Sequence, residues 1–104
     1  MNLFTPLTVG TMELPNRLVM APMSRVRADR NGVPTDIMVE HYRQRASMGL
    51  IISDGIYPSF TGQGNALMPG LVTEDHVTGW KRVTDAVHAA GGRIVAQLMH
   101  SGRV

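Results

Sequence analysis

The residues best suited to chemistry stand after three short apolar runs of the sequence: a hydroxyl at Ser24, a glycine at Gly55 and an amide at Gln97. An amide both donates and accepts hydrogen bonds at one edge of a ligand, and a hydroxyl meets a carbonyl oxygen at another. Glycine lets a ring approach the backbone closely. The set suits a flat heteroaromatic ligand. On spacing alone, a structural interpretation, in which Gln97 satisfies backbone groups and Ser24 caps a turn, is the stronger of the two.

The sequence lacks the motifs of several other common binding and catalytic sites. No Gly-rich phosphate fingerprint follows the first apolar run, which disfavours a Rossmann dinucleotide site or a P-loop, and Gly62 and Gly64 are expected to permit turns. Ser24 lacks nucleophile-elbow glycines, which disfavours a hydrolase built from Ser24, Asp54 and His100. The four histidines are not spaced as metal ligands and cysteine is absent, so no metal site is predicted.

Length and composition limit the remaining function classes. With 104 residues, 43% of them hydrophobic and 17% charged, the chain is expected to form at most one compact globular unit, a single domain segment over residues 1–104. A net charge of +2 and interrupted arginines disfavour nucleic-acid binding. No basic leader and no apolar run near the roughly 18 residues of a membrane span occur, so a cytoplasmic protein without a membrane partner is expected.

The elements that must position the candidate residues are strands and helices in alternation. Leu7–Val9 and Met12–Leu14 flank Gly10-Thr11 and predict a small hairpin. Continuous apolar runs are typical of strands that are buried on both faces, as in parallel sheets. Such runs occupy residues 17–23, 49–52 and 93–98.

Two helices are predicted between these strands. The first begins at the cap Thr35, is followed by a stop at Gly49, and buries residues at a spacing of four, namely Met38, Tyr42 and Ala46. The second begins at the cap Thr73, has Glu74 and Asp75 in its first turn, and ends at Gly91-Gly92. Its predicted inner face consists of Val77, Trp80, Thr84 and Val87.

The order of hairpin, strand, helix, strand, helix, strand predicts an α/β fold with a parallel sheet and right-handed crossovers. A barrel and a doubly wound sheet both remain open at this point. In either topology, ligands gather at the carboxyl ends of the strands, where Ser24, Gly55 and Gln97 are expected.

In these residues the sequence resembles the Old Yellow Enzyme family of FMN-dependent ene-reductases. The matching stretches, in order, are LFTPLTVG, ELPNRLVMAPMSR, PTDIMVEHYRQRASMGLIISDG and MPGLVTEDHVTGWKRVTDAVHAAGGRIVAQLMHSGR. The resemblance implies the N-terminal part of a (β/α)₈ TIM barrel, with three parallel strands, two helices and a hairpin that closes the base. It also implies FMN lying across the carboxyl ends of the strands.

The resemblance assigns cofactor contacts to five positions. Pro22 and Met23 would meet the flavin through the backbone, and Ser24 would hydrogen-bond near its O4 and N5 edge. Many relatives have Thr at this position and one subgroup has Cys. Ser keeps the hydroxyl of Thr but lacks the methyl that fixes the rotamer, so function is expected to be kept with a somewhat altered reduction potential of the flavin. Gly55 would face the isoalloxazine, and Gln97 would bind the pyrimidine edge.

The resemblance further implies that NADPH reduces the flavin, after which N5 delivers hydride to an alkene conjugated to a carbonyl or nitro group. Asn65 stands where many relatives carry an active-site Tyr, and Met99 where many carry Trp. Both changes remove an aromatic wall, so a wider and more adaptable substrate pocket is expected.

A barrel of this type needs roughly 250 residues, so the sequence is expected to be a fragment. By the resemblance, the catalytic residues and the phosphate-binding residues lie beyond Val104, and none lies within residues 1–104. The expected partners are the remainder of the barrel or another copy of the chain. The alternative is a cofactor-free half-barrel that oligomerises as an interaction module.

Overall fold

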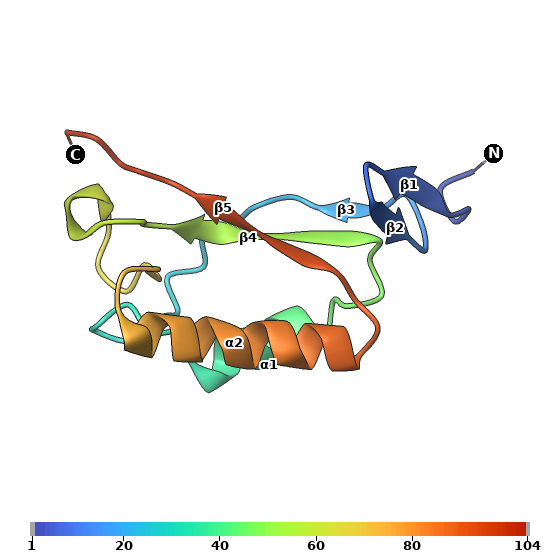
Figure 1. The fold of residues 1–104 in the computed structure, drawn as a ribbon. Coiled ribbons are helices and arrows are strands. Elements are labelled where there is room, and N and C mark those ends of the chain that lie inside the picture. The colour runs from blue at the N-terminus through green and yellow to red at the C-terminus, as the bar shows by residue number, and fades with distance from the viewer. Residues whose placement is uncertain (1, 104) are drawn as a thin grey trace.

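The computed structural model describes residues 2–103, and the predictions that concern Val104 and any residues beyond it lie outside this range. A three-stranded parallel sheet lies over two helices (Figure 1), with the strand order β3(Val19–Met20), β4(Leu50–Ile56), β5(Ile94–Leu98). The predicted hairpin is confirmed as β1(Leu7–Val9) paired antiparallel with β2(Met12–Leu14). It stands beside the amino ends of the parallel strands, at the end of the sheet opposite their carboxyl ends (Figure 1).

Two strands differ in length from the prediction. Strand β3 pairs over only two residues of the predicted run 17–23, which reaches Pro22, a residue with no N–H to donate to a ladder. Strand β4 runs on to Ile56, past the predicted end at residue 52. Ser53 and Asp54 interrupt the apolar run, but both side chains are buried, so their polarity did not mark the end of the strand.

The first helix, α1(Asp36–Arg43), begins after Thr35 as predicted but ends earlier than expected. Thr35 occupies the cap position without a side-chain cap, because its Oγ1 donates instead to the carbonyl of Arg27 at 2.6 Å. The helix ends before Gly49, which is therefore not its stop. A Cβ at Gly49 would lie 2.2 Å from the carbonyl oxygen of Asn16, so glycine here permits the close approach of two backbones.

The second helix, α2(Glu74–Ala89), begins with the predicted cap. Thr73 Oγ1 accepts from the backbone N–H of His76 at 3.2 Å, and the ring Nδ1 of His76 accepts in return from the N–H of Thr73 at 3.2 Å. Gly91, with a φ of +84°, follows the helix as predicted. Val77 is 50% exposed, so its predicted place on the inner face is wrong. The buried residues of α2 are His76, Gly79, Trp80, Val83 and Val87.

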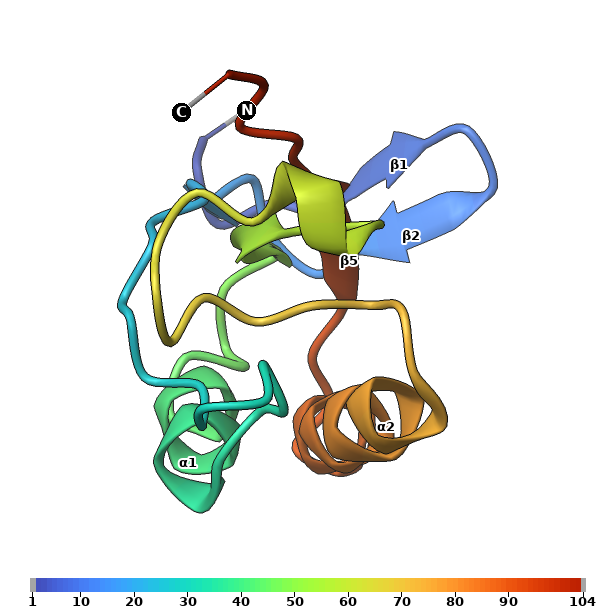
Figure 2. The ribbon, with the colours of Figure 1, turned by 90° about the vertical axis from the view of Figure 1, so that its left-hand side faces the viewer.

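The core lies between the helices and one face of the sheet, and both helices cover that same face (Figure 2). Met20, Ile51 and Ile56 point into it from the strands, and Tyr42 and Val83 point into it from the helices. Within residues 2–103, no helix has the length and apolar character needed to cross a membrane. The opposite face of the sheet is left without a covering layer (Figure 2).

The cap of α2 yields a test of the fold. Thr73→Ala is expected to lower the free energy of unfolding by about 1 kcal/mol, because an N-cap hydroxyl satisfies a backbone donor that otherwise has no partner. Thr78→Ala, the same substitution at an exposed position of the same helix, serves as the control and is expected to change stability by less than about 0.5 kcal/mol. Urea unfolding followed by circular dichroism measures both. Equal stabilities of the two variants would contradict the cap.

Candidate functional site

The sheet brings three of the predicted residues to one edge. Ser24 follows β3, Gly55 lies in β4 and Gln97 lies in β5, all toward the carboxyl ends of parallel strands. Gly55 and Gln97 are register partners. Both lie inside strands: Gln97 falls within the predicted run 93–98, whereas Gly55 had been expected after a strand that ended at residue 52.

Gly55 and Gln97 lie on the sheet face that the helices do not cover. Ile94 packs against the core on the helix side, and side chains alternate along a strand, so Gln97 points the other way. Val95 and its partner Ile52 share this uncovered face. A flat ligand lying across the strand ends would thus meet an amide beside a position that has no side chain.

Two polar side chains at this edge, those of Ser24 and Gln97, have no partner among the residues that the structure describes. Within residues 2–103, neither the hydroxyl of Ser24 nor the amide of Gln97 makes a hydrogen bond. The interpretation in which Ser24 caps a turn and Gln97 satisfies backbone groups therefore has no support in this part of the chain. Pro22 is half-buried, whereas Met23 and Ser24 are exposed in the segment after β3.

Met99 and Asn65 lie in different surroundings. The backbone N–H of Met99 donates to the carbonyl of Ile56 at 2.9 Å, which holds it beside the end of β4. A Cβ placed on Gly55 would lie 3.0 Å from Met99 Cε, so Met99 packs directly against Gly55. Asn65 is exposed and lines a separate depression of about 410 Å³ with Phe60 and other loop residues.

The loop after β4 docks against the segment after β5. The N–H of Ser101 donates to the carbonyl of Gly62 at 3.0 Å. A Cβ on Gly62 would lie 2.9 Å from the ring of His100, and one on Gly64 would lie 2.2 Å from Ser101 Oγ. These two glycines therefore permit close packing. Gly62 also ends a short 3₁₀ helix, Phe60–Gly62, in line with the expected turn, although neither glycine has a positive φ.

The residues of the disfavoured hydrolase do not come together. His100 Nδ1 accepts from the N–H of Gly102 at 2.9 Å, and its Nε2 faces Thr61 Oγ1 at 3.5 Å. Asp54 instead bonds Tyr42. In the part of the chain that the structure describes, no group of three His, Cys, Asp or Glu side chains could hold a metal ion.

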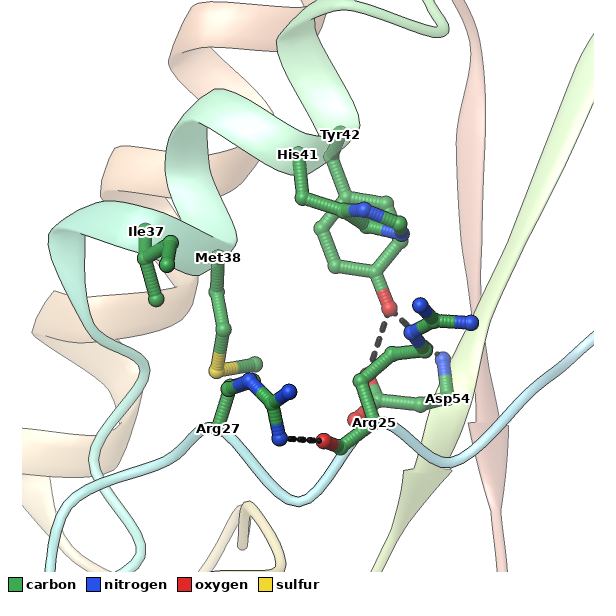
Figure 3. Close-up of a pocket in the computed structure, with 7 residues that line it drawn as sticks. All are labelled: Arg25, Arg27, Ile37, Met38, His41, Tyr42 and Asp54. Carbon is green, nitrogen blue, oxygen red and sulfur yellow. Dashed lines mark hydrogen bonds between the residues drawn. The ribbon is translucent and has the colours of Figure 1, made fainter.

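A buried pair, Tyr42 and Asp54, connects α1 to β4 (Figure 3). The Tyr42 hydroxyl donates to Asp54 Oδ1 at 2.5 Å and accepts from the backbone N–H of Asp54 at 2.8 Å. Burial raises the pKa of Asp54 against the opposing effects of Tyr42 and Arg25, and burial together with the Asp54 charge raises the pKa of Tyr42. No sequence signal marked this pair, because Asp54 follows the predicted run 49–52 and a carboxyl there equally describes the end of a strand.

The same pair lines a pocket of about 180 Å³ on the helix side of the sheet (Figure 3). Its rim includes the guanidinium groups of Arg25 and Arg27, with His41 beside Tyr42. Burial and the nearby Arg45 and Arg25 charges lower the pKa of His41. The pocket lies on the opposite side of the sheet from Gln97, so it is distinct from the predicted ligand face.

The model of the NADH:flavin oxidoreductase / NADH oxidase family matches residues 2–104. The chain belongs to this family. A member from Leishmania infantum, named "Probable flavin mononucleotide-dependent alkene reductase", is 48% identical over 103 residues, or 94% of this chain and 27% of that protein. Another, the chanoclavine-I aldehyde reductase fgaOx3 of Penicillium roqueforti, is 50% identical over 103 residues, or 97% of this chain and 28% of that protein.

Solved members of the family have the same fold over this region. The Old Yellow Enzyme homologue from Zymomonas mobilis matches with a TM-score of 0.94 and 50% identity, covering 97% of this chain and 28% of that one. The fold is therefore the N-terminal part of a (β/α)₈ barrel, and the doubly wound alternative is excluded. The resemblance to the Old Yellow Enzyme family is confirmed. The chain spans about a quarter of the length of the relatives it matches.

Asp54 predicts a pH dependence of stability. Because its pKa is raised in the folded state, the carboxyl contributes most to stability below its ordinary pKa of about 4, and this contribution is lost as the pH rises through the raised value. Asp54→Asn keeps an acceptor for Tyr42 but removes the titration, so stability relative to the unsubstituted chain should increase from pH 4 toward pH 8.

Urea unfolding at several pH values measures this difference. Asp85→Asn, which removes a carboxylate from an exposed pair with Lys81, is the matched control and should leave the pH profile nearly unchanged. An Asp54→Asn profile parallel to that of the unsubstituted chain would show that the Asp54 carboxyl titrates as it does in the unfolded state.

Proposed function

We propose that the protein is an FMN-dependent ene-reductase that uses NADPH to reduce activated carbon–carbon double bonds, and that residues 1–104 supply part of its flavin site. The observation that carries this proposal is the pair of unpartnered polar side chains, Ser24 and Gln97, at the carboxyl edge of a barrel segment of this family. Relatives named as FMN-dependent and NADP-dependent reductases support it.

The residues present fit an isoalloxazine ring. The ring carries alternating donors and acceptors along its pyrimidine edge, and the free amide of Gln97 can both donate to it and accept from it. The Ser24 hydroxyl can donate to a carbonyl oxygen, and the backbone at Pro22 and Met23 lies in the same segment. Gly55 places no side chain beside Gln97, which leaves room for a flat ring. When bound, FMN supplies hydride transfer.

The residues near the ring also favour a roomy substrate pocket. Met99, an unbranched and adaptable side chain, packs against Gly55, and Asn65 presents a small polar group in the exposed loop after β4. Neither offers a rigid aromatic wall. We therefore propose that the substrates are α,β-unsaturated carbonyl or nitro compounds of varied size.

The uncovered sheet face supports a partner for this segment. Val19 is 48% exposed and Val95 is 36% exposed on the face opposite the helices, and apolar strands in a parallel sheet are normally covered on both faces. The remainder of a barrel covers such a face in the proposed enzyme. In the alternative function, a second copy of the chain covers it and the protein is a cofactor-free interaction module.

Titration of FMN fluorescence with the purified protein tests the flavin site. We expect quenching on binding, and Ser24→Ala is expected to weaken binding by roughly 2- to 10-fold, the effect of one neutral hydrogen bond. Ser47→Ala, the same substitution at an exposed position outside the strand ends, should bind as the unsubstituted protein does.

Two further measurements separate the alternatives. Oxidation of NADPH that depends on added cyclohexenone supports the reductase, whereas full free-flavin emission at saturating protein would falsify cofactor binding. A dimer or larger assembly by light scattering, together with absent FMN binding, would favour the interaction module.

A further inference from the structure

Strand β4 contains one residue more than β5 between two of their shared pairs. Ile52 pairs with Val95 and Gly55 pairs with Gln97, so β4 advances three residues while β5 advances two. This is a β-bulge at Ser53 and Asp54. A regular ladder continuing from Ile52 would place Asp54, not Gly55, beside Gln97.

Three side-chain contacts satisfy the backbone groups that the bulge takes out of the ladder. Ser53 Oγ accepts from the N–H of Gln97 at 3.1 Å and donates to the carbonyl of Asp54 at 2.9 Å. The N–H of Asp54 donates to the Tyr42 hydroxyl at 2.8 Å. Without these partners, buried backbone donors and acceptors would be unpaired, which destabilises this conformation of the strand.

The bulge also decides which side of the sheet each side chain occupies. Ile51 and Ile56 both point into the core, although they stand five positions apart and a regular strand would place them on opposite faces. Asp54 is directed to the helix side, where Tyr42 holds its carboxyl. Gly55 consequently falls on the uncovered face, next to Gln97 and against Met99.

We propose that Ser53, Tyr42 and Asp54 are positioning residues for the flavin site, which hold the β4 bulge so that a glycine rather than a carboxylate stands beside Gln97. The inference rests on the proposed function, because it concerns the same ligand face. None of the three side chains touches the ligand in this role. They act by fixing which residues of β4 pair with β5, and their loss shifts Gly55 and Gln97 relative to one another.

The test uses the full-length, FMN-loaded protein with the variant Tyr42→Phe. Removal of the hydroxyl is expected to raise the Kd for FMN about tenfold, the effect of roughly one buried hydrogen bond, and to shift the flavin absorption band and reduction potential. Tyr57→Phe is the matched control. Tyr57 is also buried and directly follows β4, and its hydroxyl makes no hydrogen bond within residues 2–103, so Kd and spectrum should stay at the unsubstituted values.

Three more variants test the same role independently of Tyr42. Asp54→Asn retains an acceptor for Tyr42 and should hold the Kd within about twofold, whereas Asp54→Ala should behave as Tyr42→Phe does. If Tyr42→Phe does not fold by circular dichroism, Ser53→Ala, which removes the partner of the Gln97 N–H, is expected to show the same weakening and spectral shift.

Tyr42→Phe or Ser53→Ala with an unchanged Kd and flavin spectrum overturns the positioning role alone. Unsubstituted protein that does not load FMN overturns the proposed function, and the positioning role with it.

Discussion

The parallel pairing of β4 with both of its neighbours is the interaction on which the rest of this structure depends. Because β3 and β5 align on β4 in the same direction, the segments that follow all three strands meet at one edge, while the hairpin stands at the other. Both helices pack on one face of this sheet, and Gly55 and Gln97, two of the predicted flavin contacts, lie on the other face near the carboxyl edge. The division into a packed face and a ligand face therefore follows from the strand pairing and the right-handed crossovers alone.

Much of this arrangement could be predicted from local sequence signals, and the failures have local physical causes. Thr73 caps α2 as predicted, because its hydroxyl and its backbone N–H form a reciprocal cap with His76. Thr35 also precedes an acidic first helical residue, but its hydroxyl donates to the carbonyl of Arg27, outside the helix, instead of capping. Val77 follows a helical apolar spacing and still faces solvent, because the buried stripe of α2 is centred on Val83. Such outcomes depend on tertiary contacts that no local pattern contains.

The candidate site likewise has features that could be predicted from the sequence and one that could not. The positions of Ser24, Gly55 and Gln97 near the strand ends could be predicted, because parallel strands bring their carboxyl ends together. The bulge could not, since a sequence of Ser, Asp and Gly after an apolar run equally describes a strand that has ended. Only the register between β4 and β5 shows that Ser53 and Asp54 remain inside the sheet, and only the hydroxyl of Tyr42 explains how a carboxyl is accommodated there.

The sheet face that the helices do not cover is important both for assembly of the fold and for the proposed ligand binding. Val19 and Val95 are exposed on the face that also carries Gly55 and Gln97, so whatever covers the apolar part of this face also forms the far wall of the ligand site. A ligand lying across the strand ends would contact both the segment and its cover, and it would bind the assembled form in preference to the separate parts. Such a ligand stabilises the assembly by mass action, in proportion to the logarithm of its concentration over its Kd. In the proposed enzyme, assembly of the barrel and binding of the ligand would then be two aspects of one equilibrium, and the polar groups of Ser24 and Gln97, which have no partner in this segment, would contribute to both.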